Sequence, residues 1–240
     1  MKEINHIAFI MDGNRRYAKK NMIETFKAYT YGSNKALEYI SYQVKYKVME
    51  TSFFALSCDN YKLRPIEEKL ILAKVINSFL DDERVIDYLS INKFKIRIIG
   101  NIAELKKDKE FDLTNFFKIV DQINSKNEKY RFYVNIAINY DGEKEIVNAT
   151  KKIAKLLEKG DIKLNAITPK LIKSHIDFRD SEPPQIIVRP GNAPRLSGFM
   201  LWDSKYSEIY LTKKLWPEMN EGDFVQIIDW FKNIERNFGK

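Results

Sequence analysis

An acidic residue followed at once by basic residues stands near the amino end of the chain. The apolar run 6–11 is typical of a strand buried on both faces, and residues 12–16 after it read Asp-Gly-Asn-Arg-Arg. This pattern predicts the Asp12 carboxylate beside guanidinium groups at the carboxyl end of a strand, where open α/β sheets bind ligands. One acid among several cations suits Mg²⁺ carrying a phosphorylated ligand, because Mg²⁺ takes few protein carboxylates. The alternative is a plain turn in which Asp12 caps the next helix.

A second group of basic residues follows a later apolar run. The predicted strand 185–189 ends in Arg189, and a Gly/Pro-rich loop after it carries Arg195 and Ser197. Arginine binds phosphate oxygens two at a time, and a serine hydroxyl can complete such a site. The alternative is a surface loop with solvated arginines. Glu208 lies in the next apolar run, which is usually a solvent-facing strand position and less often a second metal ligand.

The elements that must position these residues alternate along the chain. Apolar runs predict strands at 6–11, 51–56, 93–100, 130–140, 185–189 and 207–211. Helical spacing predicts helices at 31–48, 66–80, 112–124, 142–159 and 221–238, a short helix after Thr168, and a loop at 57–61. This alternation predicts the α/β class, with a mostly parallel central sheet flanked by helices. No linker or repeat divides the chain, so we expect residues 1–240 to form a single domain.

Composition limits the class of protein and its partners. Of the 240 residues 44% are hydrophobic and 31% charged, and no apolar run approaches the roughly 20 residues of a membrane-spanning helix. The single cysteine, Cys58, excludes an internal disulfide. With a strand predicted close to the start, we expect a cytoplasmic protein without a signal peptide. The net charge of +8 admits nucleic acid, an anionic membrane surface or phosphorylated substrates as partners.

Together these motifs resemble those of the cis-prenyltransferase family, whose common bacterial members are undecaprenyl diphosphate synthases. The resemblance runs nearly from end to end and rests on residues 6–16, 57–65, 135–140, 189–197, 201–202, 208–210 and 235–239. It implies a single-domain α/β fold, usually a homodimer, with a hydrophobic tunnel that we expect helix 66–80 and strand 130–140 to line. It also implies Mg²⁺-dependent condensation of isopentenyl diphosphate onto an allylic diphosphate such as farnesyl diphosphate, each new double bond being cis.

The resemblance gives each candidate residue a role. Asp12 would carry Mg²⁺ with help from Glu208, and Asn60 would shape the loss of the proton. The implied substrate contacts are Gly13, Asn14 and Arg16 for the allylic diphosphate, Arg189, Arg195 and Ser197 for isopentenyl diphosphate, and Arg15, Ser57, Tyr61 and Arg64 elsewhere in the site. No protein nucleophile is needed, because Mg²⁺ and fixed donors neutralise the leaving diphosphate. Any membrane contact should be peripheral, through the basic surface.

The chain departs from the family pattern mainly on the allylic side. Thr25 and Tyr29 stand where members usually carry an arginine and a histidine, and Glu143 replaces a common arginine. The block 57–65 has Asp for Glu, Tyr for Trp and one additional residue before its arginine. These changes leave open a different allylic substrate or an unusual product, whereas the isopentenyl half and the metal-binding acid are intact.

Other classes of function fit fewer residues. A nucleophilic enzyme would need a base, and the only histidines are His6 and His175. Segment 81–85 lacks the last acid of the Asp-Asp-x-x-Asp motif of trans-acting synthases, and no glycine-rich nucleotide motif is present. A basic nucleic-acid-binding domain fits the charge, but acids at strand ends would repel phosphodiesters, so we expect no nucleic-acid partner. A catalytically silent family member would have no need of Asp12.

Overall fold

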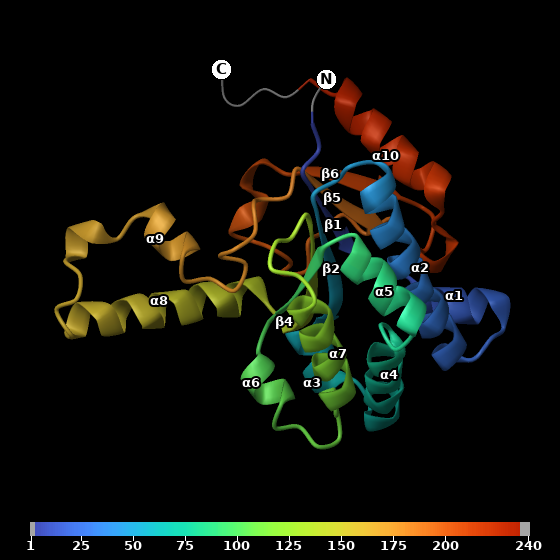
Figure 1. Cartoon of the computed structure of the whole chain (residues 1–240), viewed down its shortest axis with the longest axis horizontal. Helices are drawn as coiled ribbons and strands as arrows, with labels where there is room; N and C mark the ends of the chain where they lie inside the picture. Colours follow the sequence, from blue (N-terminus) through green and yellow to red (C-terminus); the bar gives the residue numbers. More distant parts are fainter. Residues whose placement is uncertain (1–2, 236–240) are drawn as a thin grey trace.

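A parallel sheet lies at the centre of the molecule in this computed structural model, which describes residues 3–235 (Figure 1). Its strands are β1 (His6–Ile10), β2 (Glu50–Ser57), β3 (Phe94–Ile99), β4 (Phe132–Tyr140), β5 (Ile186–Pro190) and β6 (Glu208–Thr212). They are ordered β3-β4-β2-β1-β5-β6, and every neighbouring pair is parallel. The predicted α/β class is confirmed, and the described sheet is parallel throughout rather than mostly so.

Helices connect the strands and cover both faces of the sheet (Figure 1). They are α1 (Asn14–Asn21), α2 (Thr25–Lys45), α3 (Cys58–Leu63), α4 (Ile66–Ser78), α5 (Glu83–Ile91), α6 (Ile102–Leu105), α7 (Thr114–Ser125), α8 (Gly142–Glu158), α9 (Pro169–Lys173) and α10 (Glu221–Asn233). Short 3-10 turns η1 (Leu164–Ala166), η2 (Asp203–Tyr206) and η3 (Trp216–Glu218) complete the described chain. Figure 1 shows α8 and α9 extending away from the body of the molecule as an arm.

The central strand β1 is apolar from Ile7 to Ile10 because it contributes to two cores, and its first residue, His6, is buried as well. Its Ile7 and Phe9 belong to the larger apolar cluster, which residues of α2, α4, α7 and α10 complete on one face of the sheet. Its Ala8 and Ile10 point to the other face and belong to a smaller cluster. Alternate residues of a strand face opposite sides, so a strand covered on both faces needs apolar residues throughout. This packing fixes β1 and therefore the position of the residues that follow it.

The structure differs from the predicted elements where a side chain caps a helix. The sequence predicts a loop at 57–61, but the Ser57 hydroxyl accepts a hydrogen bond from the Asn60 backbone N–H at 3.1 Å and begins α3. The Asp82 side chain likewise accepts from the Arg84 backbone N–H and begins α5, which was not predicted. Helix α2 begins at Thr25 rather than at residue 31. Of the predicted closing helix 221–238, residues 236–238 lie outside the described residues.

Candidate active site

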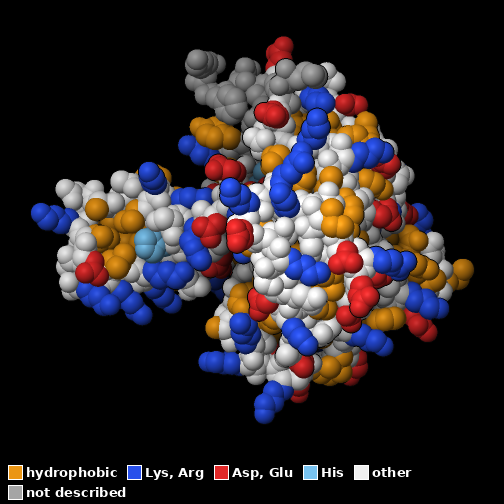
Figure 2. Space-filling view, in the orientation of Figure 1, with side chains coloured by type: hydrophobic (Ala, Val, Ile, Leu, Met, Phe, Trp, Pro, Cys, Tyr) orange, Lys and Arg blue, Asp and Glu red, His pale blue; other side chains and the backbone are white. Residues whose placement is uncertain are grey.

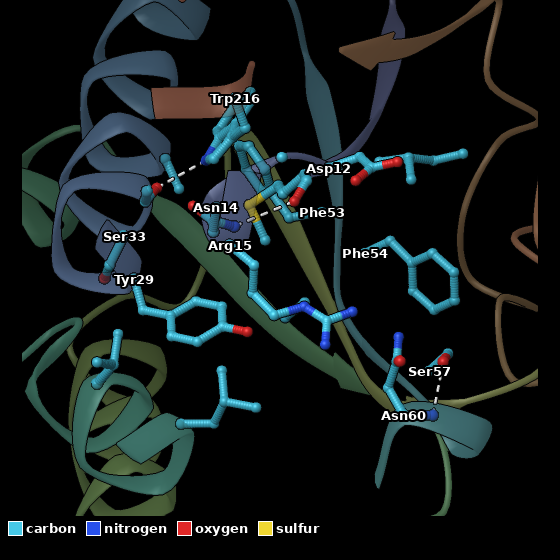
Figure 3. A pocket seen from close by; sticks show the side chains of 18 of the residues that line it. Asp12, Asn14, Arg15, Tyr29, Ser33, Phe53, Phe54, Ser57, Asn60 and Trp216 are labelled. Carbon is cyan, nitrogen blue, oxygen red and sulfur yellow. Dashed lines mark hydrogen bonds between the residues drawn. The ribbon is translucent and has the colours of Figure 1, made fainter. Parts of the chain in front are cut away.

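A cavity of about 760 Å³ opens at the carboxyl ends of β1, β2 and β5 (Figure 3). Its polar lining consists largely of the sequence candidates: Asp12, Gly13, Asn14, Arg15, Arg16, Ser57, Asn60, Arg64, Arg189, Arg195 and Ser197. Its apolar lining includes Phe53, Leu72, Val75, Ile76, Phe79, Phe116 and Ile136. Both predicted tunnel walls, α4 and β4, therefore contribute. A cavity that is cationic in one part and apolar in another fits a ligand with a charged head and a hydrocarbon tail.

Asp12 lies where the two basic groups of the sequence meet. Its Oδ2 accepts a hydrogen bond from Nη2 of Arg189 at 3.0 Å, and its Oδ1 lies 3.1 Å from Nη2 of Arg16. Arg189 is buried, whereas 28% of the Asp12 side chain is exposed. Parallel strands end at the same edge of the sheet, so the ends of β1 and β5 deliver both motifs to one place. The carboxylate can therefore reach a ligand in the cavity while it stays paired with a buried cation.

The loop after β5 is folded around two guanidinium groups. Arg189 donates through Nη1 to the Ser197 hydroxyl at 2.9 Å and to the Arg195 carbonyl. Arg16 donates through Nη1 to the Gly191 carbonyl at 2.9 Å. Gly191 has a φ of +81°, which favours glycine, and a Cβ there would lie 2.0 Å from Nη2 of Arg16 and displace its guanidinium. Nε of Arg189 is buried and has no hydrogen-bond acceptor. An anionic ligand in the cavity would supply that acceptor.

The start of α1 does not use Asp12 as a cap. Gly13 occupies the cap position with a φ of 115°, and no side-chain cap hydrogen bond forms there. A Cβ on Gly13 would lie 2.9 Å from the side chain of Leu215, so this position also requires glycine. The first N–H groups of a helix attract anions when no side chain caps them. Asp12 and Gly13 do form a turn, but the Asp12 side chain does not cap α1, and the uncapped helix start adds to the anion-binding character of the cavity.

Two of the predicted site residues do not line the cavity. Tyr61 is buried in the wall, where its hydroxyl donates to Asp108 and its ring packs edge-on against Phe111. Glu208 begins β6 opposite Ile186, at the amino end of β5, whereas Arg189 further along β5 reaches the cavity. Within the part of the chain described, Glu208 is therefore not brought to Asp12. Its role as a metal ligand stays a prediction.

The residues that depart from the family pattern differ in whether they line the cavity. Tyr29 of α2 lines the cavity, whereas Thr25 and Glu143 do not appear in its described lining. Thr25 begins α2, and Glu143 lies exposed in the first turn of α8. Burial raises the pKa of the Tyr29 hydroxyl to about 12, so it remains protonated at neutral pH. Of the departures from the family pattern, Tyr29 and Asp59 (the Asp-for-Glu change in block 57–65) are in the cavity lining.

Ser57 lines the cavity, but the cysteine and the histidines that a nucleophilic mechanism would use lie elsewhere. Cys58 is buried and donates to the Asn139 carbonyl at 3.2 Å, and burial raises the pKa of its thiol. His6 is fully buried beside the Ser52 hydroxyl at 2.8 Å, and burial lowers its pKa. Neither they nor His175 belong to the cavity lining described above. Residues 3–235 also contain no group of three or more metal-ligating side chains. An oxygen-only site built on Asp12 still suits Mg²⁺, which substrate phosphates help to hold.

The cavity at the carboxyl edge of this parallel α/β sheet has a cationic part and an apolar part. This combination is typical of enzymes that bind phosphorylated substrates with a hydrocarbon tail. The family model described as "Putative undecaprenyl diphosphate synthase" matches residues 10–239. The chain belongs to this family, the cis-prenyltransferases.

Relatives and a solved structure agree with this family. The chain is 32% identical to the ditrans,polycis-undecaprenyl-diphosphate synthase ((2E,6E)-farnesyl-diphosphate specific) of Buchnera aphidicola, over 98% of the chain and 90% of the relative. It is 31% identical to the tritrans,polycis-undecaprenyl-diphosphate synthase (geranylgeranyl-diphosphate specific) of Picrophilus torridus, over 98% and 89%. The lavandulyl diphosphate synthase of Lavandula x intermedia, solved in complex with dimethylallyl diphosphate, has the same fold. Its TM-score is 0.89 at 24% identity, over 99% of this chain and 98% of that one.

Proposed function

We propose that this protein condenses isopentenyl diphosphate with an allylic diphosphate in the presence of Mg²⁺ and forms a cis-polyprenyl diphosphate. One observation carries the proposal: a single cavity joins the Asp12–Arg189 pair to an apolar interior. A diphosphate head needs the first part, and a prenyl tail needs the second.

The residues present fit a bound Mg²⁺. Asp12 supplies a partly exposed carboxylate, and the surrounding guanidiniums attract the diphosphate oxygens that complete the coordination of such an ion. When bound, Mg²⁺ supplies charge neutralisation of the leaving diphosphate. Arg195 and Ser197 lie beside Arg189 and would hold isopentenyl diphosphate, while Arg16 and the start of α1 would hold the allylic diphosphate.

The other lining residues would control the fate of the allylic cation. The aromatic and aliphatic side chains of β2, α4 and α7 exclude water, which would otherwise capture the cation before the isopentenyl double bond attacks. Asn60 lies in the polar lining and would position the condensed product for the loss of its proton. The relatives named above are specific for farnesyl diphosphate or geranylgeranyl diphosphate, and we take farnesyl diphosphate as the first candidate.

The test uses purified protein, Mg²⁺, radiolabelled isopentenyl diphosphate and a panel of allylic diphosphates from dimethylallyl to geranylgeranyl. We expect butanol-extractable labelled polyprenyl product with at least one primer. Asp12→Ala should abolish turnover. Asp87→Ala, which removes an exposed acid of α5, is the matched control and should not change it. Absence of product with every primer would refute the proposal, and activity in Asp12→Ala would refute the metal assignment.

We also propose that the enzyme forms a homodimer. Ile209 and Leu211 on the edge strand β6 are 47% and 37% exposed, and they form an apolar stripe of the kind that a second copy covers. Sedimentation equilibrium of the wild type should give twice the mass of the chain, whereas Ile209→Lys should shift it toward the monomer. A monomeric wild type at micromolar concentration would contradict this proposal.

No helix within residues 3–235 is long and apolar enough to cross a membrane. We propose peripheral contact instead, through the segment around the α3–α4 junction. There Leu63 and Leu70 are 82% and 50% exposed, and Lys62 and Lys69 accompany them. On the face in Figure 2, lysine and arginine side chains on the body are interleaved with acids rather than gathered in one basic surface. Leu63→Ser should weaken sedimentation with vesicles containing phosphatidylglycerol, whereas the equally exposed Ile91→Ser should not.

A further inference from the structure

Four side chains from four segments form a charged network beside the cavity. The Tyr29 hydroxyl of α2 donates to Oε1 of Glu68 in α4 at 2.6 Å. Arg64, which follows α3, donates through Nη1 to the same Glu68 oxygen at 2.7 Å and also to the Tyr29 hydroxyl oxygen. Nε of Arg15 from α1 lies 4.0 Å from that oxygen. Figure 3 shows Tyr29 and Arg15 reaching into the cavity from their helices.

Glu68 is the common partner in this network, although it does not itself line the described cavity. Arg15, Tyr29 and Arg64 do line it. The side chains of Glu68 and Arg64 are each only 15% exposed, so each needs the other to offset the loss of water around its charge. Without the carboxylate, a nearly buried guanidinium would face a second guanidinium with no anion between them. Glu68 therefore determines where the cations on this side of the cavity lie.

The Tyr29 hydroxyl keeps its proton over the neutral pH range. Burial, opposed by the Arg64 guanidinium and assisted by the Glu68 carboxylate, raises the pKa of this hydroxyl to about 12. The hydroxyl is therefore a constant donor to Glu68, whereas an imidazole at this position would titrate near pH 6.5. The aromatic ring also lies 5.7 Å from the Arg64 guanidinium, within the range of a cation–π contact.

The cations of the cavity fall into two groups. Arg16 and Arg189 pair with Asp12, whereas Arg15 and Arg64 are arranged around Glu68. Nε of Arg64 is buried and has no acceptor, so a small rotation toward the cavity would be favourable once phosphate oxygens arrive. The second group thus has a free donor for the allylic diphosphate, which Arg16 of the first group would also contact.

We propose that Glu68 and Tyr29 are positioning residues that hold Arg64 and Arg15 for the diphosphate of the allylic substrate. This inference rests on the proposed function and deepens it. It predicts that the network changes the affinity for the allylic substrate and leaves the isopentenyl site unchanged, because Arg189, Arg195 and Ser197 contact one another and are not part of the Glu68 network.

The test is calorimetric titration of the Mg²⁺-loaded protein with farnesyl diphosphate alone, which cannot react without isopentenyl diphosphate. Glu68→Gln should raise the dissociation constant about 5- to 30-fold and Tyr29→Phe about 3- to 10-fold. The double variant should be no worse than Glu68→Gln alone, because the hydroxyl has then already lost its charged partner. Glu67→Gln and Tyr31→Phe are matched controls: the first is the exposed neighbouring acid, and the second is an exposed tyrosine on the same helix as Tyr29. Neither control should change binding.

Steady-state kinetics provide the second readout. The KM for the allylic substrate should rise in both variants, and the KM for isopentenyl diphosphate should stay within twofold of the wild-type value. Equal increases in both KM values, or the same loss in Glu67→Gln, would overturn the inference. If Glu68→Gln does not fold, Tyr29→Phe alone decides the question, since it removes one oxygen atom. If the wild type binds farnesyl diphosphate but elongates no primer, the proposed function fails while the calorimetric test of the network still stands.

Discussion

Replacing Asp12 by asparagine should have opposite effects on diphosphate binding with and without Mg²⁺. Asp12 pairs with Arg189 and Arg16, and these are the guanidiniums that we expect a diphosphate to contact. Without Mg²⁺, the carboxylate and the diphosphate are like charges that compete for the same cations. Asp12→Asn removes that competition and keeps the size of the side chain. In EDTA the variant should therefore bind inorganic pyrophosphate more tightly than the wild type.

The magnitude follows from the geometry. A phosphate oxygen held by Arg189 would lie about 6 Å from the Asp12 carboxylate, which is the sum of two hydrogen-bond lengths. Two unit charges at that distance repel by roughly 3 kcal/mol at an effective dielectric constant of about 20. The Asp12 side chain is 28% exposed, so solvent screening reduces this repulsion to roughly 1–2 kcal/mol. The affinity of the variant in EDTA should thus increase about 5- to 30-fold.

The assay is calorimetry of pyrophosphate binding in EDTA and in Mg²⁺, with Asp87→Asn as the control for loss of a distant surface charge. Mg²⁺ should strengthen binding to the wild type and have little effect on Asp12→Asn, because the variant lacks the carboxylate that would hold the ion. If Asp12→Asn weakens pyrophosphate binding in EDTA as well, the reasoning is refuted. That result would mean that Asp12 serves to hold Arg189 in place and does not compete with the ligand.

Three further predictions concern other parts of the molecule. Arg195→Ala should raise the KM for isopentenyl diphosphate by about 10- to 150-fold, because it removes a charge-assisted hydrogen bond of roughly 1.5–3 kcal/mol. An equal rise in the KM for the allylic substrate would contradict the assignment of Arg195 to the isopentenyl diphosphate site. Phe79→Ala enlarges the apolar interior and should lengthen the product seen by mass spectrometry; an unchanged length would mean that the tail does not reach α4. Burial raises the pKa of Glu145 to about 7, so its contribution favours the folded state below pH 4.5 and is lost as the pH rises through 7. Relative to wild type, Glu145→Gln should therefore gain about 2–3 kcal/mol of unfolding free energy between pH 4.5 and 7.5, measured by urea denaturation, and a pH-independent difference would contradict the shift.

The meeting of Asp12 and Arg189 could be expected from the sequence because it depends on strand topology. Both residues follow or end apolar strands, and the carboxyl ends of parallel strands lie at one edge of the sheet. The two candidate wall elements, residues 66–80 and 130–140, also contribute to the cavity lining, but which of their side chains face the cavity could not be predicted.

The network around Glu68 could not be predicted from spacing. Its partners come from α1, α2 and the end of α3, and they meet only because these helices pack together around the cavity. Glu68 itself lies in a first helical turn where an acid is ordinary, so no local signal distinguishes it from the exposed Glu67 beside it. Tyr61 shows the reverse case. Its position in a motif suggested a ligand contact, but the cap at Ser57 forms α3 and places the ring in the wall.

The most direct test of the account is a crystal structure of the protein with Mg²⁺, farnesyl diphosphate and the unreactive thio analogue of isopentenyl diphosphate. We predict two diphosphate groups side by side in the cavity, one contacting Arg189 and Arg195, with Mg²⁺ on the Asp12 carboxylate and the farnesyl chain between α4 and β4. A structure with either diphosphate bound outside this cavity, or with Mg²⁺ away from Asp12, would contradict the central claim.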